Sequence, residues 1–174
     1  MKAAPVGHKV GVLITYLPHD SASLRLYDVD TKRLVWDRKF HEDVNGYSLA
    51  FSPDGSKIAV AMPLARKGTG LLVIDINSRQ ELLRLTSRED TLPAAAAFAS
   101  NHELATVPSW GHGHMNEGSI EFWNIDTRKM TRQITASPGG VHAYVDISKD
   151  CRRILAYIGR EKTVGHFPES ADQR

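Results

Sequence analysis

The sequence has little of what would tie it to a disulfide framework, a nucleic acid or a membrane. Its only cysteine, Cys151, cannot form an internal disulfide, so the fold must be stable without cross-links. The 22 Lys and Arg residues nearly balance the 20 Asp and Glu residues and are interleaved with them, whereas a nucleic-acid-binding surface needs a basic face. No apolar run approaches the roughly 20 residues of a membrane span, and no targeting segment is visible. We therefore expect a cytoplasmic protein that binds neither nucleic acid nor membrane.

Catalytic and cofactor-binding motifs are missing as well. The sequence contains no Gly-x-Ser-x-Gly nucleophile elbow, no phosphate-binding Gly-x-Gly-x-x-Gly and no Walker sequence. Its 8 histidines are scattered and form no local Ser-His-Asp or Cys-His pattern. We expect no catalytic residue, no cofactor and no enzymatic activity in this chain.

The stretch from Trp110 to Asn116 is the most unusual local sequence. Its histidines, His112 and His114, are two positions apart, and with Glu117 they offer the donor types that bind zinc or copper. Two histidines in a glycine-rich loop lack the spacing of a multi-ligand metal site. We therefore interpret this stretch as a polar loop and expect no metal.

A repeated unit organises the rest of the chain. Three strand-like runs end in an acidic or amide residue that is followed by a turn, at Leu24–Asp28, Leu71–Asp75 and Ile120–Asn124. The end points are 47 and then 49 positions apart, a period typical of solenoids and propellers.

Short strands bounded by turn residues fill each period. A full unit of four antiparallel strands occupies about residues 44–85, and a second one follows from Ala94 to Ile134. The alanine run before Phe98 favours a helix by propensity, but it occupies the place of residues 48–50 one repeat earlier, so we predict a strand. The sequence therefore predicts an all-β protein.

Two motifs carry a resemblance to a known family. The nine residues Phe51–Ala59 contain a Ser-Pro-Asp-Gly turn, and later strands end in the pairs Tyr27-Asp28 and Trp123-Asn124. Together they resemble the WD-repeat (WD40) β-propeller family over about residues 9–160. His41 stands close to where that family keeps a structural histidine, although the family's Gly-His pair is absent. The resemblance implies a divergent protein-interaction scaffold.

The number of strands does not fit a closed ring. Counting from Lys9 gives about three and a half blades, whereas propellers have 4 to 8 blades of four strands. Three alternatives remain open: a fragment of a larger propeller, two copies associated edge to edge, or a small, distorted four-bladed ring. We divide the chain into an N-terminal segment (1–8), the blades (9–160) and a tail or further strand (161–174).

A partner is expected at one end of the blades. In a four-stranded meander, the loop entering the first strand and the loop joining the second to the third lie on the same face. These loops are the long ones here, and long loops on a rigid scaffold concentrate binding residues. We predict a protein or peptide partner bound by His41, Arg66, Lys67, Trp110, His112 and His114. The alternative function is a regulatory or substrate-gating propeller of a larger peptidase or quinoprotein-like enzyme, whose catalytic part lies outside these residues.

Overall fold

The computed structural model describes residues 1–16, 21–40, 48–61, 69–86, 91–110, 117–138, 142–148 and 153–159. Within these ranges the protein is all-β, with 14 strands and no helix. The described residues accordingly include no helix with the length and hydropathy needed to cross a membrane. The predicted fold class is confirmed.

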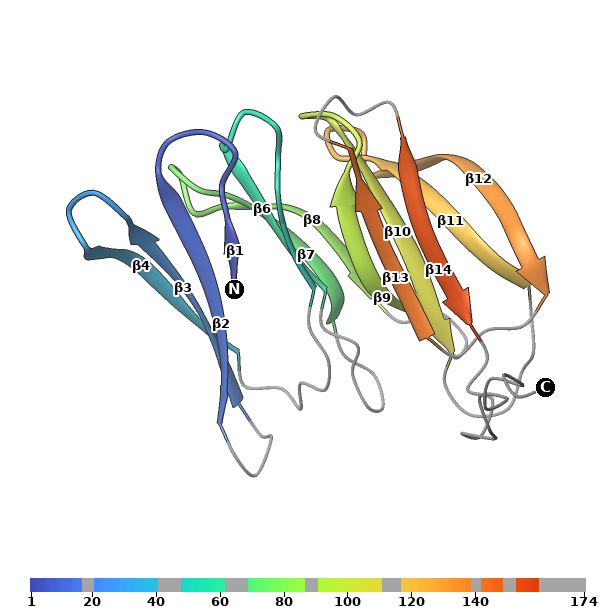
Figure 1. Ribbon diagram of the computed structural model, residues 1–174, viewed down its shortest axis with the longest axis horizontal. Coiled ribbons are helices and arrows are strands. Elements are labelled where there is room, and N and C mark those ends of the chain that lie inside the picture. Colours follow the sequence, from blue (N-terminus) through green and yellow to red (C-terminus); the bar gives the residue numbers. More distant parts are fainter. Residues whose placement is uncertain are drawn as a thin grey trace, which may run out of the picture.

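The strands form three four-stranded antiparallel sheets and one two-stranded sheet, which we call blades 1 to 4 (Figure 1). Blade 1 consists of β1 (Lys2–Ala3), β2 (Lys9–Tyr16), β3 (Ser21–Asp28) and β4 (Arg33–Phe40). Blade 2 consists of β5 (Ser48–Phe51), β6 (Lys57–Ala61), β7 (Thr69–Asp75) and β8 (Glu81–Thr86). Blade 3 consists of β9 (Thr91–Phe98), β10 (Glu103–Trp110), β11 (Glu117–Asn124) and β12 (Lys129–Pro138), and blade 4 of β13 (His142–Ile147) and β14 (Ile154–Gly159).

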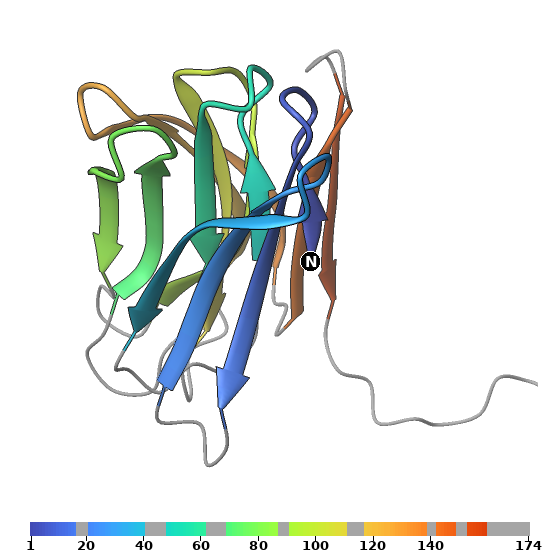
Figure 2. The same cartoon turned by 90° about the vertical axis from the view of Figure 1, so that its left-hand side faces the viewer.

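The blades stand side by side in chain order as an open arc, in agreement with the predicted three and a half blades. Figure 2 shows the inner strands β1 and β13 on one side of the molecule and the outer strands β8 and β12 on the other. The four sheets are not closed into a ring.

Blade 1 obtains its innermost strand from residues that the sequence pattern did not assign to a strand. In β1, Lys2 pairs with Gly11 and Ala3 pairs with Val10. A strand of two residues is too short to show the alternation by which strands are recognised in a sequence.

The core lies between neighbouring blades, so a strand in a blade with two neighbours is buried on both faces. In β7, Leu72 and Ile74 pack against blade 1, and Leu71 and Val73 pack against blade 3. Successive side chains of a strand point to opposite faces, which explains why this strand is continuously apolar.

The strand predicted at the alanine run is confirmed by this packing. The alanine run ending at Phe98 is part of β9, an innermost strand on which Ala96 and Ala97 are buried between blades. Trp36 in β4 and Trp123 in β11 also pack between blades and are only 6% and 7% exposed.

Candidate functional site

One end of the blades carries the tight turns, and the repeated acidic or amide residue fixes them. The Oδ1 atom of each such residue accepts a hydrogen bond from a backbone N–H three residues later, at 2.7 to 2.8 Å. The same oxygen accepts a bond from the hydroxyl of that later residue, and the three pairs are Asp28 with Thr31, Asp75 with Ser78 and Asn124 with Thr127. The motif that defined the repeat therefore has a structural role in starting each turn.

These contacts also lower the pKa of the two carboxyl groups, Asp28 and Asp75. The pKa of Asp28 is lowered, chiefly by the backbone N–H of Thr31, and that of Asp75 is lowered, chiefly by the backbone N–H of Ser78. These donors stabilise the ionised form, so both carboxyl groups stay charged. Asn124 accepts the equivalent hydrogen bond with an uncharged amide oxygen.

Each of these turns ends in a residue with a left-handed backbone. The φ angles are 57° at Lys32, 63° at Arg79 and 57° at Arg128. In each hairpin the strand register shifts within two residues of the strand's end. Four residues connect the paired strand ends in each hairpin, and the last of them has the left-handed backbone that glycine usually adopts.

The turns between first and second strands are also repeated. The N–H of Ser52 donates to the carbonyl of Lys57 at 3.0 Å, and its hydroxyl accepts the N–H of Lys57 at 2.9 Å. Ser148 and Arg153 form the same two hydrogen bonds, both at 2.9 Å. The serine at the start of each turn therefore closes the hairpin through the same pair of hydrogen bonds.

Two histidine–aspartate pairs on this end of the blades were not predicted. The Nδ1 atom of His8 lies 2.6 Å from Oδ2 of Asp30, and the same atoms of His102 and Asp126 lie 2.6 Å apart. Each pair joins the turn before the second strand to the turn after the third. The signal in the sequence was a histidine one residue before the second strand and an acid two residues after the third.

A charged contact joins blades 1 and 2 at their outer strands. Arg38 of β4 forms an ion pair with Glu81 of β8. The Oε2 atom of Glu81 also lies 2.7 Å from Nη2 of Arg84. Partial burial raises the pKa of Glu81, but hydrogen bonds from Arg84 and Arg38 outweigh it, so the net pKa is lowered. All three side chains remain partly exposed, so the pair contributes modestly to stability.

The other end of the blades is where the sequence predicted partner binding. The connections from β4 to β5, β6 to β7, β8 to β9 and β10 to β11 all leave from this end, because the sheets are antiparallel meanders. Five predicted residues lie outside the described residues: His41, Arg66, Lys67, His112 and His114. Trp110 is the last residue of β10, where its backbone pairs with Thr91, and this places it at the predicted end of blade 3.

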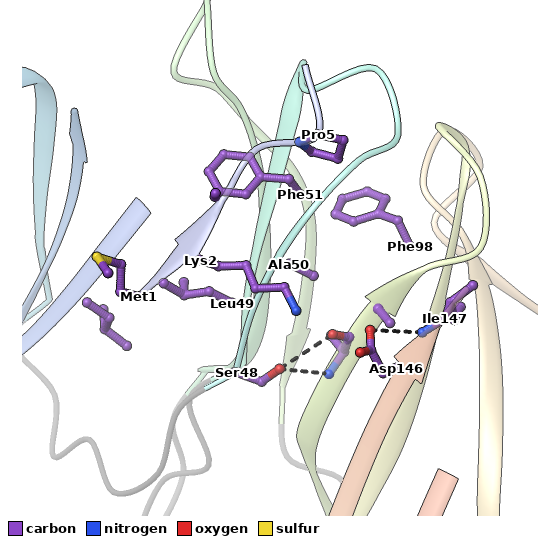
Figure 3. A pocket seen from close by; sticks show the side chains of 14 residues that line it. Met1, Lys2, Pro5, Ser48, Leu49, Ala50, Phe51, Phe98, Asp146 and Ile147 are labelled. Atoms are coloured by element: carbon purple, nitrogen blue, oxygen red, sulfur yellow. Dashed lines mark hydrogen bonds between the residues drawn. The ribbon is translucent and has the colours of Figure 1, made fainter. Parts of the chain in front are cut away.

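A cavity of about 690 Å³ lies along the inner strands (Figure 3). Its walls are mostly apolar, and Lys2, Ser48 and Asp146 supply polar side chains. Lys2 and Asp146 point into it from opposite sides. The hydroxyl of Ser48 lies 3.4 Å from both the carbonyl oxygen and the backbone nitrogen of Ala96, which links β5 to β9. The described residues contain no group of three or more His, Cys, Asp or Glu side chains that could hold a metal ion.

No family model matches the sequence, and no curated protein matches it significantly. Solved structures do superpose on it. Hydrazine synthase of Kuenenia stuttgartiensis is 18% identical, with a TM-score of 0.64 over 93% of this chain and 42% of that one. The WD40 domain of Toxoplasma gondii coronin is 13% identical, with a TM-score of 0.58 over 79% of this chain and 36% of that one. A europium-containing methanol dehydrogenase is 17% identical, with a TM-score of 0.54 over 75% of this chain and 23% of that one.

These superpositions cover less than half of each matched structure. The chain spans 42% of the hydrazine synthase chain and 36% of the coronin domain, which agrees with an arc of blades rather than a ring. The strand order, the repeated turns and the similarity to WD40 domains lead to the same result. The chain has a WD40-like β-propeller fold.

Proposed function

We propose that this chain is a non-catalytic protein-interaction scaffold of the WD-repeat type and forms part of a larger propeller. The observation that carries the proposal is the difference between the two ends of the blades. At one end, hydrogen bonds accepted by Asp28, Asp75 and Asn124 stabilise short turns. At the other end, three connections are longer: residues 41–47 between blades 1 and 2, residues 62–68 within blade 2 and residues 111–116 within blade 3. Such connections tolerate sequence variation and are where binding residues concentrate.

The proposed binding residues are those predicted from the sequence. Trp110 is the aromatic anchor, and Arg66, Lys67 and the histidines at positions 41, 112 and 114 are the polar binding residues. Tryptophan and arginine are the residue types that most often dominate binding energy in protein interfaces. The partner is accordingly a protein or peptide with an apolar side chain for Trp110 and acidic groups for the two cations. We propose a cytoplasmic setting, with neither nucleic acid nor membrane as partner.

Selection from a displayed peptide library on the purified chain tests this function. Peptides selected on the unaltered chain should bind at least tenfold more weakly to Trp110→Ala and to Arg66→Glu, with unchanged melting temperatures. Lys57→Glu is the control, because Lys57 begins β6 at the tight-turn end. Selected peptides that lose affinity equally at both ends, or only in the control, would contradict the proposed face.

A second function is supported by two of the superpositions. Hydrazine synthase and methanol dehydrogenase are enzymes by name, and both superpose on the blades. The chain would then be the regulatory or substrate-gating propeller of a larger peptidase or quinoprotein-like enzyme. Intact mass spectrometry of the protein isolated from its source distinguishes the two functions. A mass well above 19.3 kDa with a hydrolase or quinoprotein sequence attached would favour the enzyme, and a mass of 19.3 kDa would exclude it.

A further inference from the structure

Each blade has a leading face, toward the preceding blade, and a trailing face, toward the next. On the leading faces of blades 2 and 3, the second strand presents Ile58 and Val60 in β6 and Leu104 and Thr106 in β10, all 0% exposed. The corresponding residues of β2 are Val10 and Val12, as the strand pairings show: Val10 pairs with Tyr27 as Ile58 pairs with Ile74 and Leu104 with Trp123.

On the leading face of blade 1, the second strand is apolar like its buried counterparts, but no blade covers it within the described part of the chain. Val10, Val12 and Ile14 are only half-buried on it. Tyr16 at the end of the same strand is 40% exposed, and Leu34 of β4 is 48% exposed. Apolar residues that alternate along a strand in this way are typical of a sheet face that is buried against another layer.

Two buried polar atoms also lie on this face. The pairings of Val12 with Arg25 and of Ile14 with Ser23 place these polar residues on the same face as the valines. The Nε atom of Arg25 and the hydroxyl of Ser23 are buried and make no hydrogen bond to any described residue. The hydroxyl of Thr106, on the covered leading face of blade 3, is buried without a partner in the same way, so the open face of blade 1 shares this feature with a covered one.

The other end of the arc is open too. No described strand follows β14, and on the trailing face of blade 3 Ile134, which pairs with Ile120, is 44% exposed. A leading face and a trailing face of one repeat array are complementary, because blades 1 and 2 and blades 2 and 3 already pack through them.

We propose that a second copy of this chain covers the leading face of blade 1. Blade 4 of each copy packs against blade 1 of the other, and the two identical head-to-tail contacts close a ring with two-fold symmetry. The new contacts continue the interfaces between blades 1 and 2 and between blades 2 and 3. The chain spans about two fifths of the propeller chains it superposes on, so two copies supply most of such a ring. This inference rests on the proposal that the blades belong to a larger ring, and not on any binding partner.

Multi-angle light scattering over a range of concentrations tests the inference. The expected mass is twice 19.3 kDa, falling toward 19.3 kDa on dilution. Val12→Asp places a charge in the proposed interface and should raise the dissociation constant at least 100-fold. Val6→Asp is the matched control, because Val6 is an exposed valine of the same blade that lies beside Gly55 of blade 2, on the side of blade 1 opposite the proposed interface. It should leave the dimer intact.

Circular dichroism and thermal unfolding of the monomeric variant show whether Val12→Asp is folded. If the Val12→Asp variant is unfolded, Tyr16→Ser, at the more exposed end of β2, tests the interface instead. It should raise the dissociation constant of the dimer about tenfold. A 19.3 kDa mass at every concentration, an open-ended series of larger species, or equal weakening by Val6→Asp would overturn the proposal. None of these results would bear on peptide binding at the other end of the blades.

Discussion

Blades 1 and 2 have the same strand order and the same turns, but their third strands differ in pattern. In β7, the four residues Leu71–Ile74 are all buried and apolar, because a blade covers each face. In β3, Leu24 and Leu26 are buried against blade 2, while Arg25 and Tyr27, which alternate with them, are half-buried on the open face. The comparison shows that the third strand is continuously apolar in blade 2, which has a neighbour on both sides within this chain, and alternates in blade 1, which has one neighbour.

The largest difference in stability between the two blades is expected when two valines at equivalent positions, Val60 and Val12, are each replaced by alanine. Val60→Ala in β6 removes two methyl groups from a site that is 0% exposed, so it should lower the free energy of unfolding by about 2 to 3 kcal/mol. Val12→Ala in β2 should lower it by less than about 1 kcal/mol, since that side chain is only half-buried. Urea unfolding at low protein concentration measures both. Equal losses under those conditions would mean that the face of blade 1 is already covered within the monomer.

Most of the fold could be predicted from the sequence, because its signals are local and repeated. The spacing of Asp28, Asp75 and Asn124 identified the period, and that period placed the alanine run in a strand despite its helix propensity. The strand β1 could not be predicted. Only its pairing with Gly11 and Val10 distinguishes Lys2 and Ala3 from an irregular terminus.

Less of the candidate site than of the fold could be predicted from the sequence. The end of the blades that carries long connections followed from strand order alone, and the structure places Trp110 there. The pairing of His8 with Asp30 was missed, because its members are 22 positions apart and meet only when two turns of one blade come together. The free leading face was missed for the same reason, since Val10 and Val12 look like any other strand until their buried counterparts in β6 are known.

A substitution at Gly55, in the turn before β6, tests how tightly the N-terminal segment is held against blade 2. Gly55 has a φ of 70°, and a Cβ atom there would lie 2.5 Å from the carbonyl oxygen of Val6. Gly55→Ala must therefore shift a backbone as well as accept an unfavourable φ, and we expect a loss of about 2 kcal/mol. Gly7→Ala is the control, with a φ of 83° and only the flexible end of Lys9 in the way at 3.1 Å.

The control should cost about 1 kcal/mol, close to the backbone penalty alone. Thermal unfolding followed by circular dichroism measures the difference between the two variants. If Gly55→Ala costs no more than Gly7→Ala, the segment containing Val6 is free to move away, and blade 1 is held to blade 2 by its core residues alone.

The smallest effect should be the same in both blades, because it arises within a single hairpin. Lys32 in blade 1 and Arg79 in blade 2 have φ angles of 57° and 63°, which cost a residue with a Cβ atom about 1 to 2 kcal/mol. Glycine removes that cost but is more flexible in the unfolded chain, so Lys32→Gly and Arg79→Gly should each stabilise the protein by about 0.5 kcal/mol. Arg33→Gly is the control, because Arg33 begins β4 and glycine weakens a strand. Chemical unfolding should show equal gains at Lys32 and Arg79 and a loss at Arg33. A gain confined to blade 2 would show that the open face of blade 1 loosens even its turns, and the contrast between the blades would then extend beyond their packing.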